Sequence, residues 1–319
     1  MALYMPYLHG KQEELMALVS MSPSLGELVV PIIKPVNVDL SRTVGRLARI
    51  SADSRLALIM NSDKGPNRRP PTYGEATGVL SSPRLKDTVH NVLPAFELRG
   101  GTPLAEFERF SQDFADRICV VVHKRHTYSA AELQRVMHFS QPPVHVYIEP
   151  GVSATSLAAL PSRANLVLRD GFSSCERNAL YPAQSAFDDL AYQYQARHFA
   201  GFGDFCMIGD SYSATGGPAR AVALHLTEDR GSELIMNHLV STAVGVDVAT
   251  MYFEALELLS ACLGTPVRDD LDTQGSRMYV ESRRNRQYHG LGLAKRWSIM
   301  HHLEIVLRIL VSQGTAPAF

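Results

Sequence analysis

The chain has 319 residues, of which 45% are hydrophobic and 20% charged, and its formal net charge is −1. This length can bury a large core, and the composition is ordinary for a globular protein. The near-zero charge excludes a global attraction to nucleic acid or to an acidic membrane, so such binding would need a local patch. No apolar stretch approaches the ~20 residues that cross a bilayer.

The N-terminus lacks the basic and apolar regions of a signal peptide. The four cysteines lie far apart and form no CxxC pair, so neither a disulfide framework nor a zinc site has suitable spacing. We therefore expect free thiols and a cytoplasmic location. The cysteines are Cys119, Cys175, Cys206 and Cys262.

Short apolar runs that end in a polar or charged residue alternate with longer segments of helical periodicity. Near-continuous apolar strands between helices indicate a parallel sheet buried on both faces. Eight such runs in about 200 residues favour a closed (β/α)8 TIM-like barrel over an open doubly wound sheet. The predicted strands are 29–36, 55–62, 92–100, 117–125, 144–151, 165–172, 204–211 and 220–227.

Two helix signals accompany the predicted strands. Residues 11–21 have helical periodicity, and we expect this helix to precede the first strand and to close the bottom of the barrel. Ser129, with Glu132 three residues later, has the spacing of a capping box at the start of another helix.

The end of the predicted barrel is irregular. The nine residues SYSATGGPA between the last two runs are too few for a crossover helix. Either the seventh helix is reduced to a turn, or one of these two strands is antiparallel. Residues 222–241 read as a hairpin around Asp229-Arg230-Gly231 that extends the last strand. We expect residues 1–243 to form the barrel and 244–319 a helical C-terminal extension packed on it, with a loop-rich segment at 264–292.

Four stretches of the chain are similar to one known family. They are YMPYLHGKQEELMAL near the N-terminus, PIIKPV in the first predicted strand, IMNHLVS in the hairpin and LAKRWSIMHHLEIVL near the C-terminus. Together they resemble the bacteriophage beta-protein family of bacterial and phage genomes, for which no reaction is established. The resemblance implies a phage-related or antiphage-defence setting, with a protein partner such as a neighbouring nuclease-like protein.

In a barrel of this kind the ligand site lies where the strands end at their carboxyl side, because the loops there are free to vary. The residues at these ends carry mixed charges, as an active site requires and as any solvent-facing rim also shows. The predicted end-of-strand residues are Lys34, Asn61, Glu97, Arg125, Glu149, Asp170, Asp210 and His225.

Lys34 and Glu149 each stand one residue before a proline, which holds the backbone extended at both positions. If the two side chains converge over the barrel, they can form an acid/base pair in which burial tunes the lysine. The alternative is a structural ion pair across the mouth of the barrel.

Three carboxylates on neighbouring predicted strands, Glu149, Asp170 and Asp210, are weak candidates for a Mg²⁺ or Mn²⁺ site, with His225 as a fourth ligand. Arg169 can instead neutralise these carboxylates. Strand alternation sends Arg169 and Asp170 to opposite faces, so only one of them points inward.

Three loops are candidates for binding phosphate groups. In SYSATGGPAR (211–220) the consecutive glycines Gly216 and Gly217 let backbone N–H groups approach an anion, although a tight turn explains them better. The basic loops 65–75 and 282–290 contain aromatic residues and can contact the phosphates of a nucleic acid, or lie as solvated surface.

The sequence also contains two pairs of histidines that the predicted elements bring close together. His225 and His238 lie on the two arms of the hairpin. They share a face if the turn centres between Arg230 and Gly231, and face opposite ways if it centres on Arg230. Residues 301–302 are adjacent histidines on a helix, where a core or helix-end role is expected.

The sequence leaves three functions open. The family resemblance and the absence of a complete catalytic motif favour a regulatory barrel that binds a partner protein. The alternative is an enzyme that acts on a small anionic or phosphorylated ligand, with Lys34 and Glu149 as acid and base and with Gly216, Gly217 and Arg125 holding the anion. A third is a metal-dependent phosphoesterase, a hydrolase built on Glu149, Asp170 and Asp210.

Overall fold

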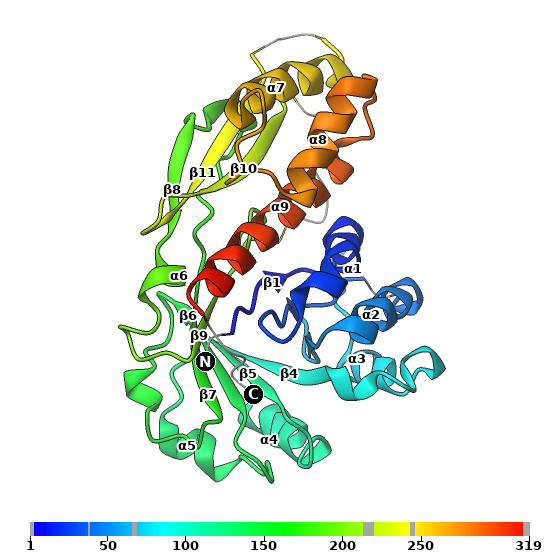
Figure 1. The fold of residues 1–319 in the computed structure, drawn as a ribbon. Helices are drawn as coiled ribbons and strands as arrows, with labels where there is room; N and C mark the ends of the chain where they lie inside the picture. Colours follow the sequence, from blue (N-terminus) through cyan, green and yellow to red (C-terminus); the bar gives the residue numbers. More distant parts are fainter. Residues whose placement is uncertain (1–2, 38, 66–68, 213–219, 243–245, 315–319) are drawn as a thin grey trace.

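The fold was established from a computed structural model that describes residues 3–37, 39–65, 69–212, 220–242 and 246–314 (Figure 1). Its main feature is an eight-stranded, all-parallel sheet in the order β1-β2-β3-β4-β5-β6-β7-β9. The strands are β1 (Tyr7–Leu8), β2 (Ile32–Ile33), β3 (Leu56–Ile59), β4 (Val92–Arg99), β5 (Val120–Lys124), β6 (Val144–Glu149), β7 (Ala164–Arg169) and β9 (Gly201–Asp204).

The N-terminal segment closes this sheet into a barrel. Tyr4 forms parallel bridges with both Val29 and Phe202. The Met5 N–H donates to the Phe202 carbonyl, and the Phe202 N–H donates to the Leu3 carbonyl, both at 2.9 Å. The first strand thus pairs with the last, which confirms the predicted TIM-like barrel.

Two of the predicted strand assignments are wrong. Residues 29–36 contain the second strand, because β1 precedes them, and the helix predicted at 11–21 lies between the first two strands as α1 (Gln12–Leu25). The eighth predicted run, 220–227, does not enter the barrel. It begins β10 (Ala223–Asp229), which lies in a separate antiparallel sheet with β11 (Leu234–Val240) and β8 (Gln184–Asp188). Neither explanation for the short connection holds as predicted, because the barrel is all-parallel and β10 is antiparallel to β11 in the separate sheet.

The hairpin predicted at 222–241 is confirmed as β10 and β11, but neither predicted register is observed. Ala223 pairs with Val240 and Asp229 with Leu234, so the turn centres between Gly231 and Ser232. His225 therefore lies directly opposite His238.

Helices surround the barrel and form most of the C-terminal region. The predicted capping box is present at α5, where the Ser129 hydroxyl accepts from the Glu132 N–H and the Glu132 carboxylate accepts from the Ser129 N–H. The remaining helices are α2 (Ser41–Asp53), α3 (Tyr73–Leu80), α4 (Leu104–Asp113), α5 (Ala130–Arg135), α6 (Leu190–Gln193), α7 (Val248–Leu263), α8 (Gln274–Asn285) and α9 (Leu291–Ser312).

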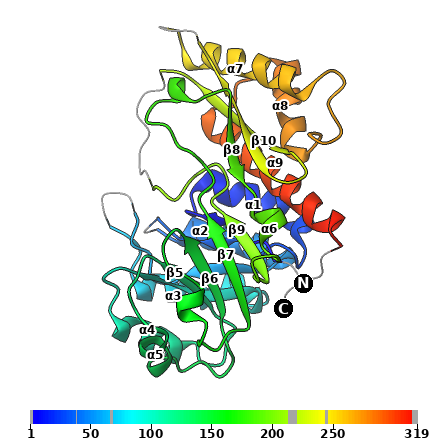
Figure 2. The ribbon, with the colours of Figure 1, turned by 90° about the vertical axis from the view of Figure 1, so that its left-hand side faces the viewer.

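The small sheet lies with α7 and α8 at one end of the molecule, and the barrel lies at the other (Figures 1 and 2). Helix α9 connects them, because it packs against α1 of the barrel as well as against β10 and α8. The segment 264–292, predicted to be loop-rich, contains α8, which starts at a Thr273 cap that accepts from the Ser276 N–H. Among the described helices, none has the length and apolar character to span a membrane.

Strand alternation decides which polar residues reach the barrel interior. Val30 and Ile32 point inward on β2, so Lys34 follows in the inward series. On β4, Ala95 is inward and Glu97 follows. The interior below them is apolar and tightly filled, so these charges lie only at the carboxyl ends of the strands, the mouth of the barrel.

Candidate functional site

A buried charge network occupies the mouth at the ends of β1 to β4. Lys34 and Glu97 are 1% and 0% exposed, and the Lys34 Nζ lies 2.9 Å from Glu97 Oε1. Lys34 also pairs with Asp63, and the Tyr7 hydroxyl donates to the other Glu97 oxygen. Arg99 donates to Glu97 Oε1 at 3.1 Å. Such buried charges are retained only when they are paired this closely.

The surrounding cations keep the carboxylates of this network ionised. Burial acts to raise the pKa of Glu97, but Lys34, Lys124 and Arg99 outweigh it and lower this pKa below its ordinary value. Burial likewise opposes ionisation of Asp63, yet Lys34 and then Arg99 lower the pKa of its carboxyl to about 2.

Asn61, a predicted binding residue, fixes the strand that carries Glu97. Its side-chain amide donates to the Glu97 carbonyl and accepts from the Glu97 N–H, both at 2.9 Å. The Asn61 carbonyl in turn accepts from the Arg99 guanidinium at 2.9 Å. Because the NH2 group and the oxygen of its amide both bond to the backbone of Glu97, Asn61 serves mainly to position Glu97 and Arg99.

A cavity of about 280 Å³ opens beside this network at the ends of β5, β6 and β7. Lys124 continues the inward series of β5 and pairs with Asp210. Asp170 accepts from the Asp210 N–H at 2.8 Å and from the Phe172 N–H at 3.2 Å. These side chains line the cavity together with Arg125, Glu149 and Arg169, and Ile148 and Phe205 form its apolar part.

Asp170 stands at the rim of the cavity, where its side chain reaches solvent. The chain packed around its carboxyl nevertheless raises the pKa of Asp170 above its ordinary value, chiefly through partial burial, with Asp210 and Asp204 adding repulsion. A carboxyl that is both accessible and harder to ionise is suited to proton transfer.

An unusual backbone conformation places Arg125 at this rim. Arg125 has a φ of 50°, which is uncommon for a residue with a side chain, and its side chain is exposed. Gly151 makes room for it, because a Cβ there would lie 3.1 Å from the Arg125 nitrogen and 3.2 Å from its Cγ. Arg125 makes no ion pair within the described part of the chain, so its charge faces the cavity unneutralised.

The structure does not bring Lys34 and Glu149 together. Glu149 follows Ile148, which points inward, so Glu149 lies on the outer side of the barrel wall. Its carboxylate is held by Arg169 at 3.3 Å and by Arg197. Neither the predicted acid/base pair nor the ion pair across the mouth forms between these two residues, because they belong to opposite faces of their strands.

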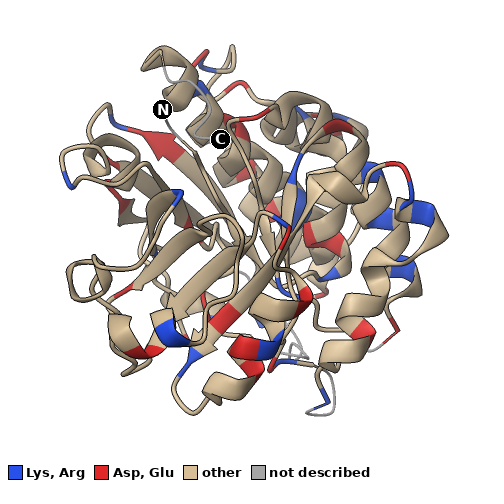
Figure 3. Cartoon of the chain, turned by 90° about the horizontal axis from the view of Figure 1, so that it is seen from below, with Lys and Arg blue, Asp and Glu red and all other residues tan. Residues whose placement is uncertain are grey.

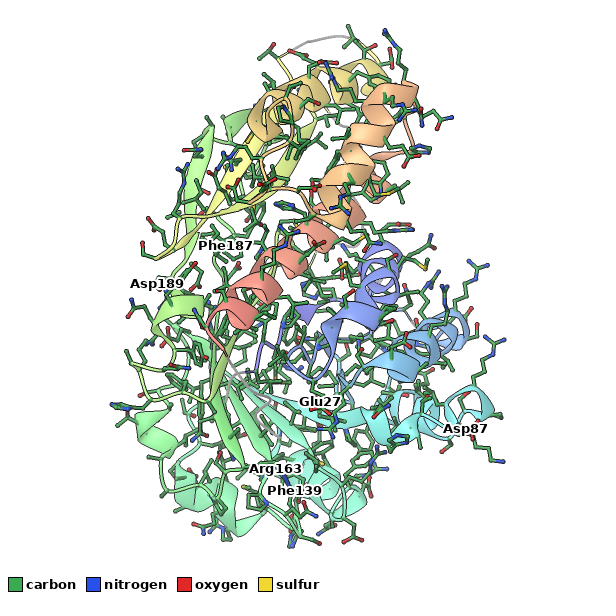
Figure 4. All side chains as sticks on the ribbon, viewed as in Figure 1. Glu27, Asp87, Phe139, Arg163, Phe187 and Asp189 are labelled. Atoms are coloured by element: carbon green, nitrogen blue, oxygen red, sulfur yellow. The ribbon has the colours of Figure 1, made fainter. Side chains whose placement is uncertain are left out.

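Arg169 and Asp170 point to opposite faces, as alternation predicts. Arg169 binds Glu149 and also Asp189 at 2.9 Å, whereas Asp170 faces the mouth. Asp189 lies on the segment between β8 and α6 (Figure 4). Arg169 therefore neutralises Glu149, and both predicted residues serve a lateral ion-pair cluster next to the mouth.

The three predicted metal ligands do not form a common site. Glu149 lines the same cavity as Asp170 and Asp210, but both of its oxygens bind arginine. Within the described ranges, the group of donor atoms close enough to share an ion is that of Asp204, Cys206 and His302, which lie within 4.8 Å of one another.

The predicted histidine pairs do not line the cavity at the mouth. His225 Nδ1 is 2.9 Å from His238 Nδ1, and His238 Nε2 is 2.9 Å from the Ser185 hydroxyl. Burial, then His238, lowers the pKa of His225 to about 3. His225 also lines a 240 Å³ cavity against α9. His301 and His302 are fully buried, in agreement with the expected core role.

The structure gives little support to the remaining predicted binding residues. Gly216 and Gly217 lie outside the described residues. In the loop 65–75, Arg69 pairs with Glu75 at 3.1 Å. In the view of Figure 3, basic and acidic positions are interspersed rather than gathered. The basic segment 282–290 includes the end of α8, where Arg283 binds Glu257 at 2.7 Å.

The sequence did not lead us to predict several residues of the mouth. Tyr7 and His9 belong to the missed first strand and its end, although the alternation of Leu3, Met5 and Tyr7 was a usable signal. Lys124 adjoins the predicted Arg125, and only the inward parity of β5 distinguishes the two. Asp63, Arg99 and Arg197 lie in or beside loops, where sequence periodicity gives no direction.

Comparison with protein-family models, with characterised proteins and with solved structures finds no match.

Proposed function

We propose that this barrel is an enzyme that binds a small anionic ligand, carrying a phosphate or a carboxylate, at its mouth. The observation that carries the proposal is the cavity at the ends of β5 to β7, in which Lys124, Arg125, Asp170 and Asp210 converge. Ligands of barrels with this architecture bind at this end, so the cavity lies where a substrate is expected.

The charged side chains of the cavity have different roles in this proposal. Arg125 offers an unpaired guanidinium whose planar donors suit a phosphate or carboxylate. Lys124 adds a second positive charge, shared with Asp210. Asp170, whose pKa is raised, acts as the general acid or base toward the bound molecule. The buried network of Lys34, Glu97 and neighbouring residues serves as a rigid wall that fixes the strand ends.

This assignment moves the acid/base role away from the pair Lys34 and Glu149. Lys34 contacts two carboxylates and is 1% exposed, so its ammonium is neither free nor accessible to a substrate. The carboxylate of Glu149 is bound by two guanidinium groups. A partner-binding role in a phage-related setting, which the family resemblance implies, rests on no contact within the described residues and stays a prediction.

An activity screen with phosphorylated and carboxylated small molecules tests the proposal. A turned-over substrate is expected, and Asp170→Asn should lower its kcat by about 100-fold or more, because a positioned general acid or base contributes this much. The control is Asp87→Asn, an exposed aspartate between α3 and β4 at the outer edge of the molecule (Figure 4), which should retain full activity. An active enzyme that is indifferent to Asp170→Asn contradicts the assignment.

A further inference from the structure

His9 is a buried histidine at the mouth that none of the roles above uses. It follows β1 directly and is 3% exposed. Its ring lies edge-on to Tyr7, with ring centres 6.2 Å apart, and edge-on to Tyr212, at 5.6 Å. Two aromatic neighbours therefore hold the imidazole in place without offering it a strong hydrogen bond.

Neither ring nitrogen of His9 has a hydrogen-bond partner among the described residues. The Gly209 backbone lies near the ring, but not in hydrogen-bonding geometry. Each of the other six buried histidines in the described ranges does bond through its ring; they are His123, His126, His145, His238, His301 and His302. An unpaired buried polar group costs stability, so its retention points to a partner that arrives from outside.

His9 does not itself line the cavity of the proposed anion site, but one residue separates the two. Gly209 connects the two: its backbone lies beside the His9 ring, and a Cβ at Gly209 would be 3.5 Å from Asp170 Oδ2. Gly209 has a φ of 67° and can approach both side chains because it has no Cβ. Asp210, which lines the cavity, also acts electrostatically on His9.

The surroundings of His9 fix its chemical character. Burial, then Lys34 and Lys11, lower the pKa of His9 to about 4, so the imidazole is neutral at pH 7. A neutral ring presents one N–H donor and one acceptor. It therefore recognises an uncharged group such as a hydroxyl or a carbonyl, rather than a second anionic group.

We propose that His9 is a ligand-binding residue of the mouth, and that the ligand carries a hydroxyl or carbonyl group next to the anionic group held by Lys124 and Arg125. The proposal rests on the proposed function, since it presumes that an anion binds at the cavity. It narrows the substrate class to phosphorylated or carboxylated compounds with such a neighbouring oxygen, for example sugar phosphates.

Binding of three probes to the full chain tests this inference: inorganic phosphate, glycerol 3-phosphate and ribose 5-phosphate. In the wild type, at least one of the two hydroxyl-bearing probes should bind about fivefold or more tighter than phosphate, the worth of one hydrogen bond. In His9→Phe this advantage should vanish while phosphate affinity stays unchanged. His9→Gln, which keeps a donor and an acceptor, should retain part of the advantage.

Thermal unfolding supplies the matched control. His9→Phe should keep or raise Tm, since it removes an unpaired polar group from an aromatic site. His301→Phe should lower Tm by several degrees, because His301 bonds Thr273 and the Thr227 carbonyl, each at 2.7 Å.

The outcomes separate the two proposals. If the wild type binds none of the probes, the proposed anion site fails. If it binds phosphate but neither hydroxyl-bearing probe binds more tightly, or if His9→Phe keeps the advantage, the role of His9 is overturned while the anion site stands. A large loss of Tm in His9→Phe, matching that of His301→Phe, would also overturn it and assign His9 to the core.

Discussion

Two groups of polar side chains, one beneath α9 and one at the mouth of the barrel, differ in how completely they are hydrogen-bonded. Beneath α9, His302 Nε2 lies 3.1 Å from the Tyr4 hydroxyl and 3.2 Å from Asp204, and His302 Nδ1 lies 2.8 Å from the Thr227 hydroxyl. The Tyr4 hydroxyl is 2.9 Å from both Asp204 oxygens. We call these four residues the α9 cluster. Every polar group in it has a partner within the chain.

The mouth of the barrel is not closed in this way. His9 has two unpaired nitrogens, Arg125 has an unpaired charge, and Asp170 stands beside a cavity. Phe187 covers the His302 ring of the α9 cluster, at 5.0 Å between ring centres (Figure 4), whereas the mouth opens to solvent. Burial alone therefore does not mark a functional site, whereas incomplete hydrogen bonding next to a cavity does.

The largest expected effect comes from breaking the α9 cluster. His302→Leu leaves the Asp204 carboxylate buried without its imidazole partner, so the free energy of unfolding should fall by about 3–5 kcal/mol. Denaturant unfolding measures this change. Asp87→Asn is the control and should stay within about 0.5 kcal/mol of the wild type. A loss for His302→Leu no larger than the control's would show that the cluster contributes nothing to stability.

A chain of three buried histidines extends the comparison to pH. His126 Nε2 lies 2.9 Å from His123 Nδ1, and His123 Nε2 lies 2.8 Å from His145 Nδ1. The ends are closed by the Tyr128 N–H, which donates to His126, and by the Pro161 carbonyl, which accepts from His145. With both ends fixed, one set of neutral tautomers satisfies every nitrogen, and adding a proton anywhere breaks a bond.

Acid should therefore destabilise the fold. Burial lowers the pKa of His126 and that of His145 to about 4, against about 6.5 in the unfolded chain. The stability tied to these neutral rings is present above pH 6.5 and is lost as the pH falls toward 4, up to about 3 kcal/mol for His126. Unfolding measured between pH 7 and 4 checks this. His126→Gln should flatten the curve, whereas the exposed His138→Gln should not; equal curves for both would contradict the account.

Glu149→Gln should have a smaller effect. The ion pairs of Glu149 with Arg169 and Arg197 are partly exposed, so their loss should cost about 1 kcal/mol of unfolding free energy. Glu149 lines the cavity, but both of its oxygens are held by arginine, so activity should change much less than in Asp170→Asn. Parallel kinetics and denaturant unfolding of this variant give both numbers. Loss of activity at full stability would restore Glu149 as a functional residue.

A small effect on stability, about 0.5–1 kcal/mol, is expected for Asp170→Asn. Its carboxyl is accessible and already disfavours the ionised form, but its two oxygens accept from the Asp210 and Phe172 N–H groups, and an amide keeps only one of these hydrogen bonds. Measured beside its activity, this variant should separate stability from function, the opposite of His302→Leu. A marked loss of stability would place Asp170 with the structural groups.

The sequence predicted the barrel because its apolar runs recur, yet it missed β1, which has two ladder residues and follows Pro6. Lys34, Glu97 and Asp170 were placed correctly at the ends of strands. Glu149 was predicted on the inner face of its strand but lies on the outer one. Both faces of a parallel barrel strand are buried, so the sequence does not distinguish the outward residues His145, Tyr147 and Glu149 from the inward Val144 and Val146. Which alternate residues of a strand point into the barrel can be decided only when the neighbouring elements are known.

Isothermal titration with inorganic phosphate, performed on the wild type and on Lys124→Met at low and high salt, tests the anion site at the mouth. The wild type should bind phosphate, salt should weaken this binding, and Lys124→Met should weaken it about tenfold or more, since one close positive charge is removed. Wild-type binding that Lys124→Met leaves intact, or the absence of binding at low salt, would contradict an anion site at the mouth of the barrel.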